Sequence, residues 1–306
     1  MKACLELPSP AKINLFLDVL SRRDDGYHDV VTVFEKIDLC DSISFSDLNT
    51  GTGVHQEGIE ITSNAPELPC DGSNLAYRAC LSLKKRYGIS KGVKIHIEKR
   101  IPIAAGLGGG SSNAAVVLRG LNRLWGLRLR DKELSDVGKG IGADVPFFIF
   151  NHSFAVGTGV GDEISPIKSD LEMWHVIISP PHRVLTKEVY DGLSLGLTAS
   201  RPDVKILVRA VEENNVRTIE KSIYNALEPV VKDKVADISA AKEMVNGWGF
   251  SAAGVTGSGP AIFVLTFGRK EAFELRGRLR DSFVSGMSGK GWKFFVAKTA
   301  TNERKE

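Results

Sequence analysis

Residues 102–115 read P-I-A-A-G-L-G-G-G-S-S-N-A-A, and they give the strongest indication of chemistry in this chain. Four of the five positions 106–110 are glycine, so few Cβ atoms prevent the backbone from closing around an anion. Two hydroxyls and an amide follow directly, at Ser111, Ser112 and Asn113. These residue types at this spacing predict a loop that binds phosphate.

The segments on either side of the glycines support this interpretation. Apolar residues alternate over residues 93–97, as in a strand, and recur at helical spacing over residues 118–125 until Gly126. The loop is therefore expected to open a helix, whose first N–H groups have no partner inside the helix. Those groups and the helix dipole favour negative charge. A solvated flexible loop, the usual meaning of a glycine run, fits this context less well.

Two common phosphate motifs are excluded by the positions of the glycines. The pattern G-x-x-x-x-G-K-[ST] requires a Lys after its last glycine, where this chain has Ser111. The dinucleotide pattern G-x-G-x-x-G needs a spacing that Gly106, Gly108 and Gly110 do not supply. The loop is therefore of another kind.

The loop resembles the phosphate loop of the GHMP kinases, the superfamily of galactokinase, homoserine kinase, mevalonate kinase and phosphomevalonate kinase. That loop has the pattern P-x-x-x-G-L-G-[GS]-S-S-A, which residues 102–115 match with one extra glycine and with Asn113 inserted before Ala114. The resemblance implies ATP as the phosphoryl donor, and it assigns Asn74 and Lys99 to the purine side of the site. It implies phosphate-side contacts from Pro102, Gly106, Leu107, Gly108, Gly109, Gly110, Ser111, Ser112 and Asn113.

Asp144 lies in the segment G-A-D-V-P at residues 142–146. A carboxylate between small residues and an apolar run is costly to bury unless a partner compensates its charge. From the residues alone, Asp144 could equally well hold a turn. The resemblance implies that it is the catalytic aspartate, which accepts the proton of the acceptor hydroxyl during phosphoryl transfer.

Lys12 and Asn14 belong to P-A-K-I-N at residues 10–14, on an expected strand. Residues two apart on a strand share a face, and two polar side chains on one face are commonly just solvated. The resemblance implies instead that this face lines the site. Lys12 would then pair with Asp144 and keep it ionised, and Asn14 would contact the substrate.

A second glycine-rich loop, G-V-T-G-S-G-P at residues 254–260, precedes the strand expected at residues 261–265. By itself it indicates only a turn into a strand. It resembles the carboxy-terminal glycine motif of GHMP kinases, which implies that Gly257 and Ser258 bind the substrate.

Residues 22–28 read R-R-D-D-G-Y-H, and such a polar turn usually lies on the surface without a binding role. With the motifs above, it resembles the branch of the superfamily that phosphorylates the 2-hydroxyl of 4-diphosphocytidyl-2-C-methyl-D-erythritol with ATP, in non-mevalonate isoprenoid biosynthesis. The resemblance implies that Tyr27 and Tyr190 sandwich the cytosine and that His28 reads its edge. Thr186, which ends a match to P-P-x-x-x-x-T, is assigned to the same site.

Two other functions remain open. Another GHMP kinase, acting on mevalonate, homoserine or a sugar, would keep the phosphate loop but would have no use for a cytosine clamp at Tyr27 and His28. A non-catalytic nucleotide-binding regulator would keep the glycines but would not need both Lys12 and Asp144. The kinase reading also implies Mg²⁺, for which the sequence identifies no protein ligands, with Ser112 only a candidate.

Composition limits the class of protein. The chain has 306 residues, 42% of them hydrophobic, and a net charge of +3, too small to indicate a nucleic-acid partner. It shows no apolar stretch of about 20 residues, no targeting segment and no Cys/His zinc pattern among its four cysteines. We expect a cytoplasmic protein, in a bacterial cytosol or in a plastid stroma if a transit peptide was removed. It would be a monomer or weak homodimer that takes a small cytidine diphosphate substrate and has no membrane partner.

Strands and helices segregate along the chain, which predicts an α+β protein. We expect strands over 13–19, 30–34, 43–45, 59–61, 145–150, 153–156, 261–265 and 292–297, and helices over 73–88, 131–138, 204–213, 218–227, 235–248 and 270–281, with turns over 157–170. The resemblance implies a two-domain GHMP kinase fold with the active site in the interdomain cleft. Residues 1–165 would form the ATP-binding, ribosomal-protein-S5-like domain, and residues 166–306 a ferredoxin-like domain. Residues 193–205 and the tail after Lys298 match no family pattern.

Overall fold

The computed structural model describes residues 5–48, 57–194, 202–286 and 291–301. Contacts divide the chain into two compact units, neither of which is one continuous segment. Unit 1 comprises Met1–Ala11, Cys40–Ile103 and Gly108–Asn151, and unit 2 comprises Lys12–Leu39, Ala104–Leu107 and His152–Glu306. The expected boundary between residues 165 and 166 stays a prediction. Cys4, residues 195–201 and the tail from residue 302 lie outside the described residues.

Two long strands, β1 (Leu5–Arg22) and β2 (His28–Asp47), contribute to both units. The sequence predicts β2 as two short strands, but the structure shows one continuous strand of 20 residues. In the middle of both strands consecutive residues are buried, because both faces are covered. The alternation of apolar and polar residues fades there, which explains why the sequence pattern breaks β2 into pieces.

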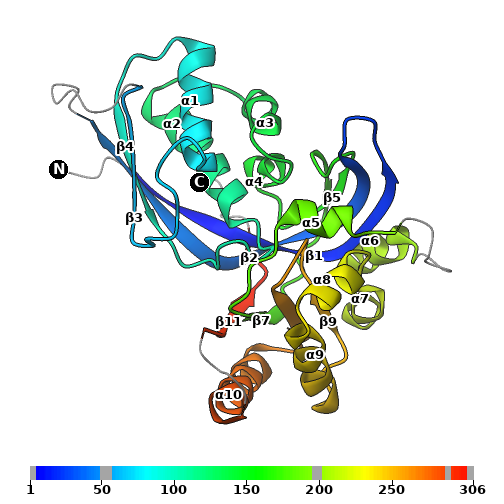
Figure 1. The fold of residues 1–306 in the computed structure, drawn as a ribbon. Helices are drawn as coiled ribbons and strands as arrows, with labels where there is room; N and C mark the ends of the chain where they lie inside the picture. The colour runs from blue at the N-terminus through cyan, green and yellow to red at the C-terminus, as the bar shows by residue number, and fades with distance from the viewer. Residues whose placement is uncertain (1–4, 49–56, 195–201, 287–290, 302–306) are drawn as a thin grey trace. The chain divides into compact units, whose positions relative to one another are not determined.

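Unit 1 combines a sheet with four helices. In the sheet β3 (Ile59–Ser63) runs parallel to β4 (Val93–Glu98), and β4 runs antiparallel to the second half of β2. The helices are α1 (Leu75–Tyr87), α2 (Gly109–Leu124), α3 (Asp131–Lys139) and α4 (Val145–Phe150), with α1 packed along α2 (Figure 1). As predicted, α1 ends at Gly88, which takes the left-handed conformation typical of a helix C-terminus.

Unit 2 contains two groups of strands. The first half of β2 pairs with β5 (Phe154–Thr158), β5 pairs with β6 (Glu163–Ile167), and β1 runs parallel to β8 (Tyr224–Asn225). A separate four-stranded antiparallel sheet has the order β11 (Lys293–Lys298), β7 (Trp174–Ser179), β10 (Ile262–Thr266), β9 (Ala253–Val255).

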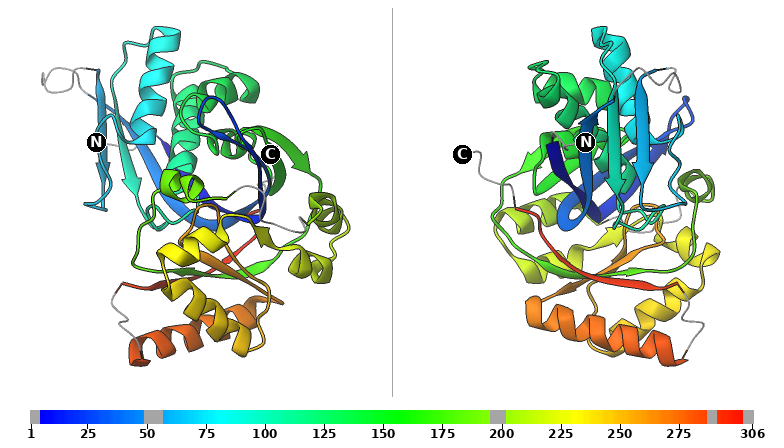
Figure 2. Two further views of the ribbon diagram at one scale, coloured as in Figure 1. Left: turned by 45° about the vertical axis from the view of Figure 1, so that its right-hand side comes forward. Right: turned by 90° about the vertical axis from the view of Figure 1, so that its left-hand side faces the viewer.

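The helices of unit 2 follow no regular alternation with its strands. They are α5 (Thr186–Asp191), α6 (Val204–Glu212), α7 (Val216–Ser222), α8 (Glu228–Lys234), α9 (Asp237–Gly247) and α10 (Arg269–Gly286). Figure 2 shows α10 lying along the four-stranded sheet, where it contacts β7, β10 and β11.

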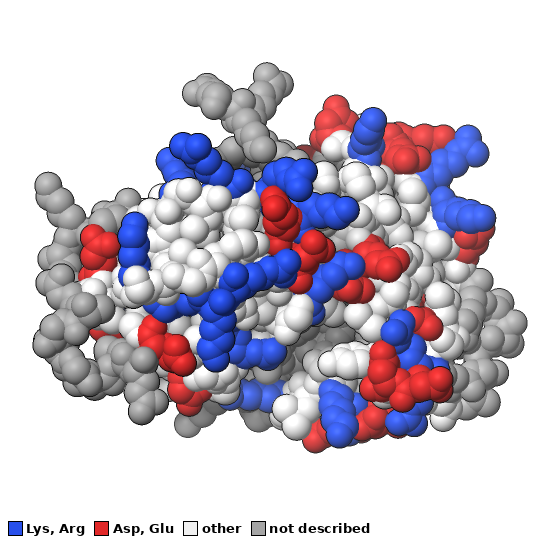
Figure 3. All heavy atoms as spheres, turned by 90° about the horizontal axis from the view of Figure 1, so that it is seen from above, with Lys and Arg blue, Asp and Glu red and all other residues white. Residues whose placement is uncertain are grey.

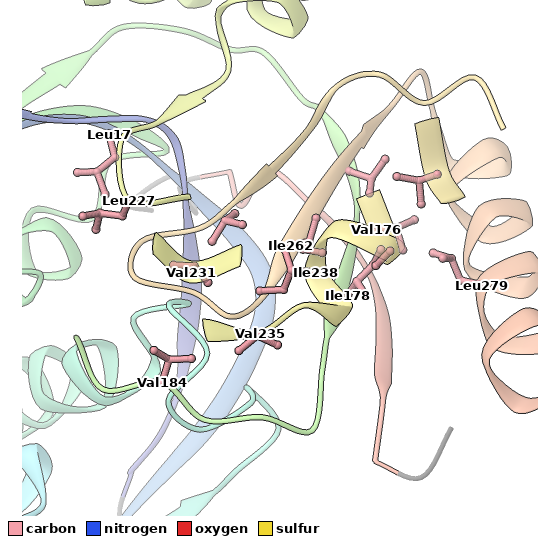
Figure 4. Close-up of a cluster of buried hydrophobic side chains, with 14 of the residues drawn as sticks. Leu17, Val176, Ile178, Val184, Leu227, Val231, Val235, Ile238, Ile262 and Leu279 are labelled. Carbon is pink, nitrogen blue, oxygen red and sulfur yellow. The ribbon is translucent and has the colours of Figure 1, made fainter. Parts of the chain in front are cut away.

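The core of unit 2 joins these helices to the strands. Figure 4 shows Leu17 from β1 next to Leu227, the N-cap residue of α8, and Ile262 from β10 next to Ile238 from α9. All four side chains are less than 5% exposed. Removing this apolar surface from water stabilises the packing by about 25 cal/mol per Å². The core therefore holds α8 against the strands that precede and follow the second glycine-rich loop.

Several predicted elements are wrong in type or extent. Residues 145–150 form helix α4 rather than a strand, because a short apolar run does not distinguish the two and Pro146 suits a first helical turn. The helix predicted over residues 218–227 ends at Ser222, and β8 follows it. Strands β6 and β7 and helices α5 and α8 were not predicted, since they are short and depend on tertiary pairing.

Surface charge agrees with the small net charge of the chain. Basic and acidic side chains are interspersed on the face drawn in Figure 3. Among the helices that the structure describes, none has both the length and the hydropathy needed to cross a bilayer. Cys70 and Cys80 are free thiols.

Candidate active site

The phosphate-binding loop ends, as predicted, at the start of helix α2 in unit 1. Gly108 is the N-cap residue, with a φ of +68°, and the Ser112 N–H donates to its carbonyl over 2.9 Å. The N–H groups of Gly109, Gly110 and Ser111 come before this first intrahelical bond, so the helix itself does not use them. No acidic residue lies in the first turn. The helix start is therefore suited to an anion.

A buried polar network lies behind this helix start. The Asp41 carboxylate accepts from the Lys99 ammonium, and also from the Asn113 side chain at 2.8 Å. The same Asn113 amide donates to Ser9 at 2.9 Å, and the Ser9 and Ser112 hydroxyls lie 2.8 Å apart. The network fixes the Ser112 side chain, which is fully buried. Its members come from separate segments of unit 1, so it ties the helix start to the sheet.

The two residues assigned to the purine side have partners inside unit 1. Burial lowers the pKa of Lys99, against the opposing effect of the nearby Asp41 carboxylate. Asn74 is the N-cap of α1: its side-chain oxygen accepts from the Ala76 N–H at 2.9 Å, and its NH₂ donates to the Pro69 carbonyl at 2.6 Å. Both side chains thus have structural roles, and contact with a purine stays a prediction.

Asp144 lies at the N-cap position of α4, half-buried, and its side chain makes no capping hydrogen bond. Two residues earlier, a Cβ built on Gly142 would lie 3.5 Å from the Ser111 hydroxyl at the start of α2. The segment that carries Asp144 therefore lies next to the expected phosphate site, and both belong to unit 1. The catalytic role assigned to Asp144 stays a prediction.

Lys12 and Asn14 share one face of β1, as predicted, but they are buried rather than solvated. Each is only 3% exposed, and the Lys12 ammonium donates to Asn14 Oδ1 at 2.6 Å. The Lys12 backbone N–H donates to the Leu107 carbonyl at 3.0 Å. Residues 104–107 of the phosphate-binding loop thus contact this strand within unit 2.

The second glycine-rich loop packs against the same residues. The Thr256 hydroxyl accepts from the Asn14 backbone N–H at 3.1 Å and lies 3.3 Å from the Gly106 carbonyl oxygen. Gly257 has a φ of +56°, and a Cβ there would lie 3.1 Å from the Lys12 ammonium nitrogen. Only glycine permits this backbone conformation so close to the ammonium group. Three motifs far apart in the sequence therefore meet in unit 2.

Two side chains, one buried and one half-buried, hold this second loop in place. Asn225 donates through its NH₂ to the Val255 and Gly257 carbonyls, at 2.7 and 2.8 Å. Glu228, at the start of α8, accepts from the Val255 N–H at 3.2 Å and pairs with Lys232 and Lys242. The loop is thus anchored by its backbone, which leaves the Ser258 side chain available for other contacts.

We expect Glu228→Gln to reduce stability by about 1–3 kcal/mol near neutral pH, because it removes charge-assisted hydrogen bonds. Burial alone raises the pKa of Glu228, but Lys242 and Lys232 outweigh it, and the pKa lies below its ordinary value of 4.5. The folded state therefore takes up this proton less readily than the unfolded state. The carboxylate contributes stability above about pH 4.5 that is lost as the pH falls through the folded-state pKa.

Urea unfolding of wild type and Glu228→Gln checks this prediction, since the difference in unfolding free energy should shrink at acid pH. Glu213→Gln is the matched control, because Glu213 forms an exposed pair with Arg209 on the surface of unit 2. A difference that stays constant with pH would contradict the role given to Glu228.

Two of the three aromatic residues of the predicted clamp are in contact. The His28 and Tyr190 rings lie 5.1 Å apart, centre to centre, with 33° between their planes. Tyr27 is 64% exposed and is the last residue of the turn between β1 and β2. Arg23 braces this turn by pairing with Asp25 at 3.0 Å and Asp29 at 3.1 Å. The turn thus presents an exposed Tyr directly before a His whose ring contacts that of Tyr190 in a tilted arrangement.

Thr186 and Ser258 were predicted separately as substrate residues, and the structure brings them together. Their hydroxyl oxygens lie 3.0 Å apart. Thr186 and Tyr190 both lie on α5, a short helix that the sequence did not predict. This helix therefore connects the aromatic pair to the second glycine-rich loop.

Several residues with positioning roles were missed in the sequence. Thr256 lies inside the second glycine-rich motif. A hydroxyl side chain among glycines was the available signal for its contact with the backbone of β1. Asn225, Asp41 and Ser9 belong to no motif, and no sequence signal marks them. Their importance follows only from the contacts they make with residues distant in the sequence.

Comparison with known proteins identifies two family domains. Residues 74–152 match the family described as GHMP kinases N terminal domain, and residues 207–292 match GHMP kinases C terminal. The first match includes α1, α2 and Asp144, and the second includes the loop at residues 254–260.

Individual relatives carry one name. The 4-diphosphocytidyl-2-C-methyl-D-erythritol kinase of Caldicellulosiruptor saccharolyticus is 40% identical over 90% of this chain and 92% of its own length. The enzyme of that name from Geobacillus kaustophilus is 44% identical over 85% of this chain and 88% of its own length.

Solved structures agree with these relatives. A crystal structure of 4-(cytidine 5'-diphospho)-2C-methyl-D-erythritol kinase superposes with a TM-score of 0.78 at 29% identity, over 97% of this chain and all of the other. Homoserine kinase from Cytophaga hutchinsonii, 19% identical, superposes with a TM-score of 0.77 over 99% of this chain and 96% of the other, and shares the fold. The chain therefore belongs to the 4-diphosphocytidyl-2-C-methyl-D-erythritol kinase family of GHMP kinases, and it has the α+β fold predicted from its motifs.

Proposed function

We propose that this protein transfers the γ-phosphoryl group of ATP to the 2-hydroxyl of 4-diphosphocytidyl-2-C-methyl-D-erythritol, a step of non-mevalonate isoprenoid biosynthesis. The observation that carries the proposal is the contact between His28 and Tyr190, 5.1 Å apart, with the exposed Tyr27 beside it in the chain. Aromatic faces and a hydrogen-bonding ring are what recognition of a pyrimidine requires. Mevalonate, homoserine and sugars offer no flat base for such residues.

The proposed roles follow from the chemistry of phosphoryl transfer, in which positioning and electrostatic stabilisation do most of the work. The free N–H groups at the start of α2 bind the phosphates of ATP. Asp144, on the segment next to Ser111, accepts the proton of the acceptor hydroxyl. Lys12 balances the negative charge that develops on the acceptor oxygen, and Asn14, Thr186, Gly257 and Ser258 orient the substrate.

Mg²⁺ is expected to accompany ATP, because it neutralises the phosphates during transfer. Within the described residues, no group of three or more His, Cys, Asp or Glu side chains could hold a metal ion by itself. This fits an ion that takes most of its ligands from phosphates and water. Ser112 could contribute only by exchanging its contact with Ser9, whereas the half-buried Ser111 hydroxyl lies closer to the Asp144 segment.

ATP consumption with different acceptors tests the proposal. Purified protein is incubated with ATP, Mg²⁺ and one acceptor, either 4-diphosphocytidyl-2-C-methyl-D-erythritol, mevalonate, homoserine or galactose, and ADP release is followed. We expect turnover with the cytidine compound only. Turnover with another acceptor would favour a different GHMP kinase, and none with any acceptor would favour a nucleotide-binding regulator.

Tyr27→Ala is expected to weaken binding of the cytidine substrate by about 1–3 kcal/mol through lost stacking. Because Tyr27 is 64% exposed, its removal costs little packing, and the KM for ATP should not change. Steady-state kinetics with each substrate varied in turn measures this. Phe267→Ala, at another exposed aromatic residue of unit 2, is the control and should behave as wild type. Equal affinity of Tyr27→Ala and wild type for the cytidine compound would remove Tyr27 from the clamp.

We further propose a cytoplasmic protein that acts as a monomer or weak homodimer. The bacterial origin of its relatives supports the proposed location. Light scattering of the purified protein across a range of concentrations tests the proposed state.

A further inference from the structure

Thr32 lies on β2 in unit 2, is 1% exposed, and connects Asn14 to the main chain of β1. The Asn14 NH₂ donates to Thr32 Oγ1 at 2.8 Å, and the Thr32 hydroxyl donates to the Phe16 carbonyl at 2.6 Å. On its other side, Asn14 accepts the bond from the Lys12 ammonium at 2.6 Å. Four groups thus form one chain of hydrogen bonds that ends at Lys12.

This chain can run in one direction only. An ammonium group has no lone pair, so Lys12 must donate and Asn14 must present its oxygen to it. The Asn14 NH₂ then faces Thr32, and because an amide NH₂ only donates, the Thr32 oxygen must accept. The Thr32 proton is left for the Phe16 carbonyl, which can only accept. The Asn14 amide is therefore oriented from both ends: Lys12 binds its oxygen, and Thr32 accepts from its NH₂ group.

The other contacts of Asn14 do not involve its side-chain NH₂ group. Thr256 accepts from the Asn14 backbone N–H, which fixes the main chain but leaves the side-chain amide free to rotate. Its hydroxyl also lies 3.3 Å from Asn14 Oδ1, a longer contact on the oxygen side of the amide. Among the described residues, Thr32 supplies the acceptor for the NH₂ group.

We propose that Thr32 is a positioning residue for phosphoryl transfer: it holds the Asn14 amide with its oxygen toward Lys12 and thereby fixes the ammonium group. The inference rests on the proposed function, in which Lys12 acts at the acceptor oxygen. Lys has a long, flexible stem, so a buried ammonium needs a fixed acceptor to stay in one place. With the amide reversed, its NH₂ group would face the ammonium, so that two buried donors would point at each other.

The test compares Thr32→Ser with Thr32→Ala, which differ by one oxygen atom and lose the same methyl group. We expect Thr32→Ser to keep kcat within about threefold of wild type, and Thr32→Ala to lose about 10- to 100-fold. The KM for ATP should change by less than about threefold in both variants, because the phosphates are bound elsewhere. Thr32→Val, which keeps the volume but not the hydroxyl, should resemble Thr32→Ala.

Thr266→Val is the matched control in unit 2. The buried Thr266 hydroxyl donates to the Trp174 carbonyl at 3.0 Å, so the variant loses the same kind of bond without touching Asn14. It should keep wild-type kcat. Equal kcat in Thr32→Ala and Thr32→Ser, or a similar loss in Thr266→Val, would overturn the proposal.

A second measurement does not depend on activity. The side-chain NH₂ signals of Asn14, assigned in ¹⁵N-labelled protein, should keep their wild-type shifts in Thr32→Ser and move in Thr32→Ala. Unchanged signals in Thr32→Ala would overturn the proposal even if kcat falls. If the wild type turned over none of the acceptors, the proposed function would fail, and this spectrum would still decide whether Thr32 orients Asn14.

Discussion

Asp144→Asn is expected to lower kcat by about 10²- to 10⁴-fold while ATP binding stays nearly unchanged. An amide has the shape of the carboxylate but cannot take the proton of the acceptor hydroxyl. Asp144 makes no side-chain capping bond to α4, so the substitution removes no cap from that helix. Its segment lies next to Ser111 at the start of α2, where the reacting phosphate is expected.

Single-turnover kinetics gives the rate of the chemical step, and isothermal titration calorimetry gives the affinity for ATP. Asp203→Asn is the matched control, because Asp203 is also an N-cap aspartate but accepts from the Lys205 N–H on α6, away from every assigned motif. Asn caps helices about as well as Asp, so this variant should be stable and fully active. A kcat for Asp144→Asn within about threefold of wild type would show that Asp144 is not the proton acceptor.

Gly106→Ala is expected to cost about 3 kcal/mol or more of stability and to lower kcat/KM at least about 100-fold. Gly106 has a φ of +78°, which an L side chain rarely adopts, and its Cβ would lie 2.1 Å from the Thr256 carbonyl oxygen. The same Cβ would lie 3.0 Å from the Gly259 backbone nitrogen. Because the obstacles are backbone atoms, the two glycine-rich loops must separate, and the contact of Thr256 with Asn14 is disturbed.

Urea unfolding and steady-state kinetics measure the two effects. Gly126→Ala is the matched control: its φ of +66° imposes similar strain, but no atom lies within 4 Å of its Cβ position. It should lose about 1–2 kcal/mol from the strain alone and keep its activity. If the two variants were equally stable and equally active, the close approach of the loops would not matter for the site.

Much of the site could be predicted because its motifs are local. The glycines, the two hydroxyls and the apolar spacing after them were enough to predict that the loop opens a helix, and α2 begins at Gly109. Lys12 and Asn14 were placed on one face by the alternation of a strand, and the structure joins them by a hydrogen bond. The family, the fold class and the kinase motifs followed from these short segments, and the comparisons confirm them.

Other features could not be predicted, because their cause lies in residues far away along the chain. The apolar run at residues 145–150 suits a helix or a strand equally well. In the structure it forms helix α4, which packs against α2 and α3. Asn74 and Lys99 were assigned to the purine side of the site, which stays a prediction; the structure also uses one as a helix cap and the other in a buried ion pair with Asp41. Sequence spacing does not show which partner a polar side chain will find.

The sequence by itself determined which chemical groups this protein possesses and that a helix begins at its glycine-rich loop, since backbone freedom and helix termini depend on neighbouring residues. The tertiary structure decided how those groups are oriented. Thr32, Thr256 and Asn225 are unremarkable in the sequence, but they control the Asn14 side chain and the loop at residues 254–260. The physical reason is that a buried polar group must find a partner, and only folding determines which one it meets.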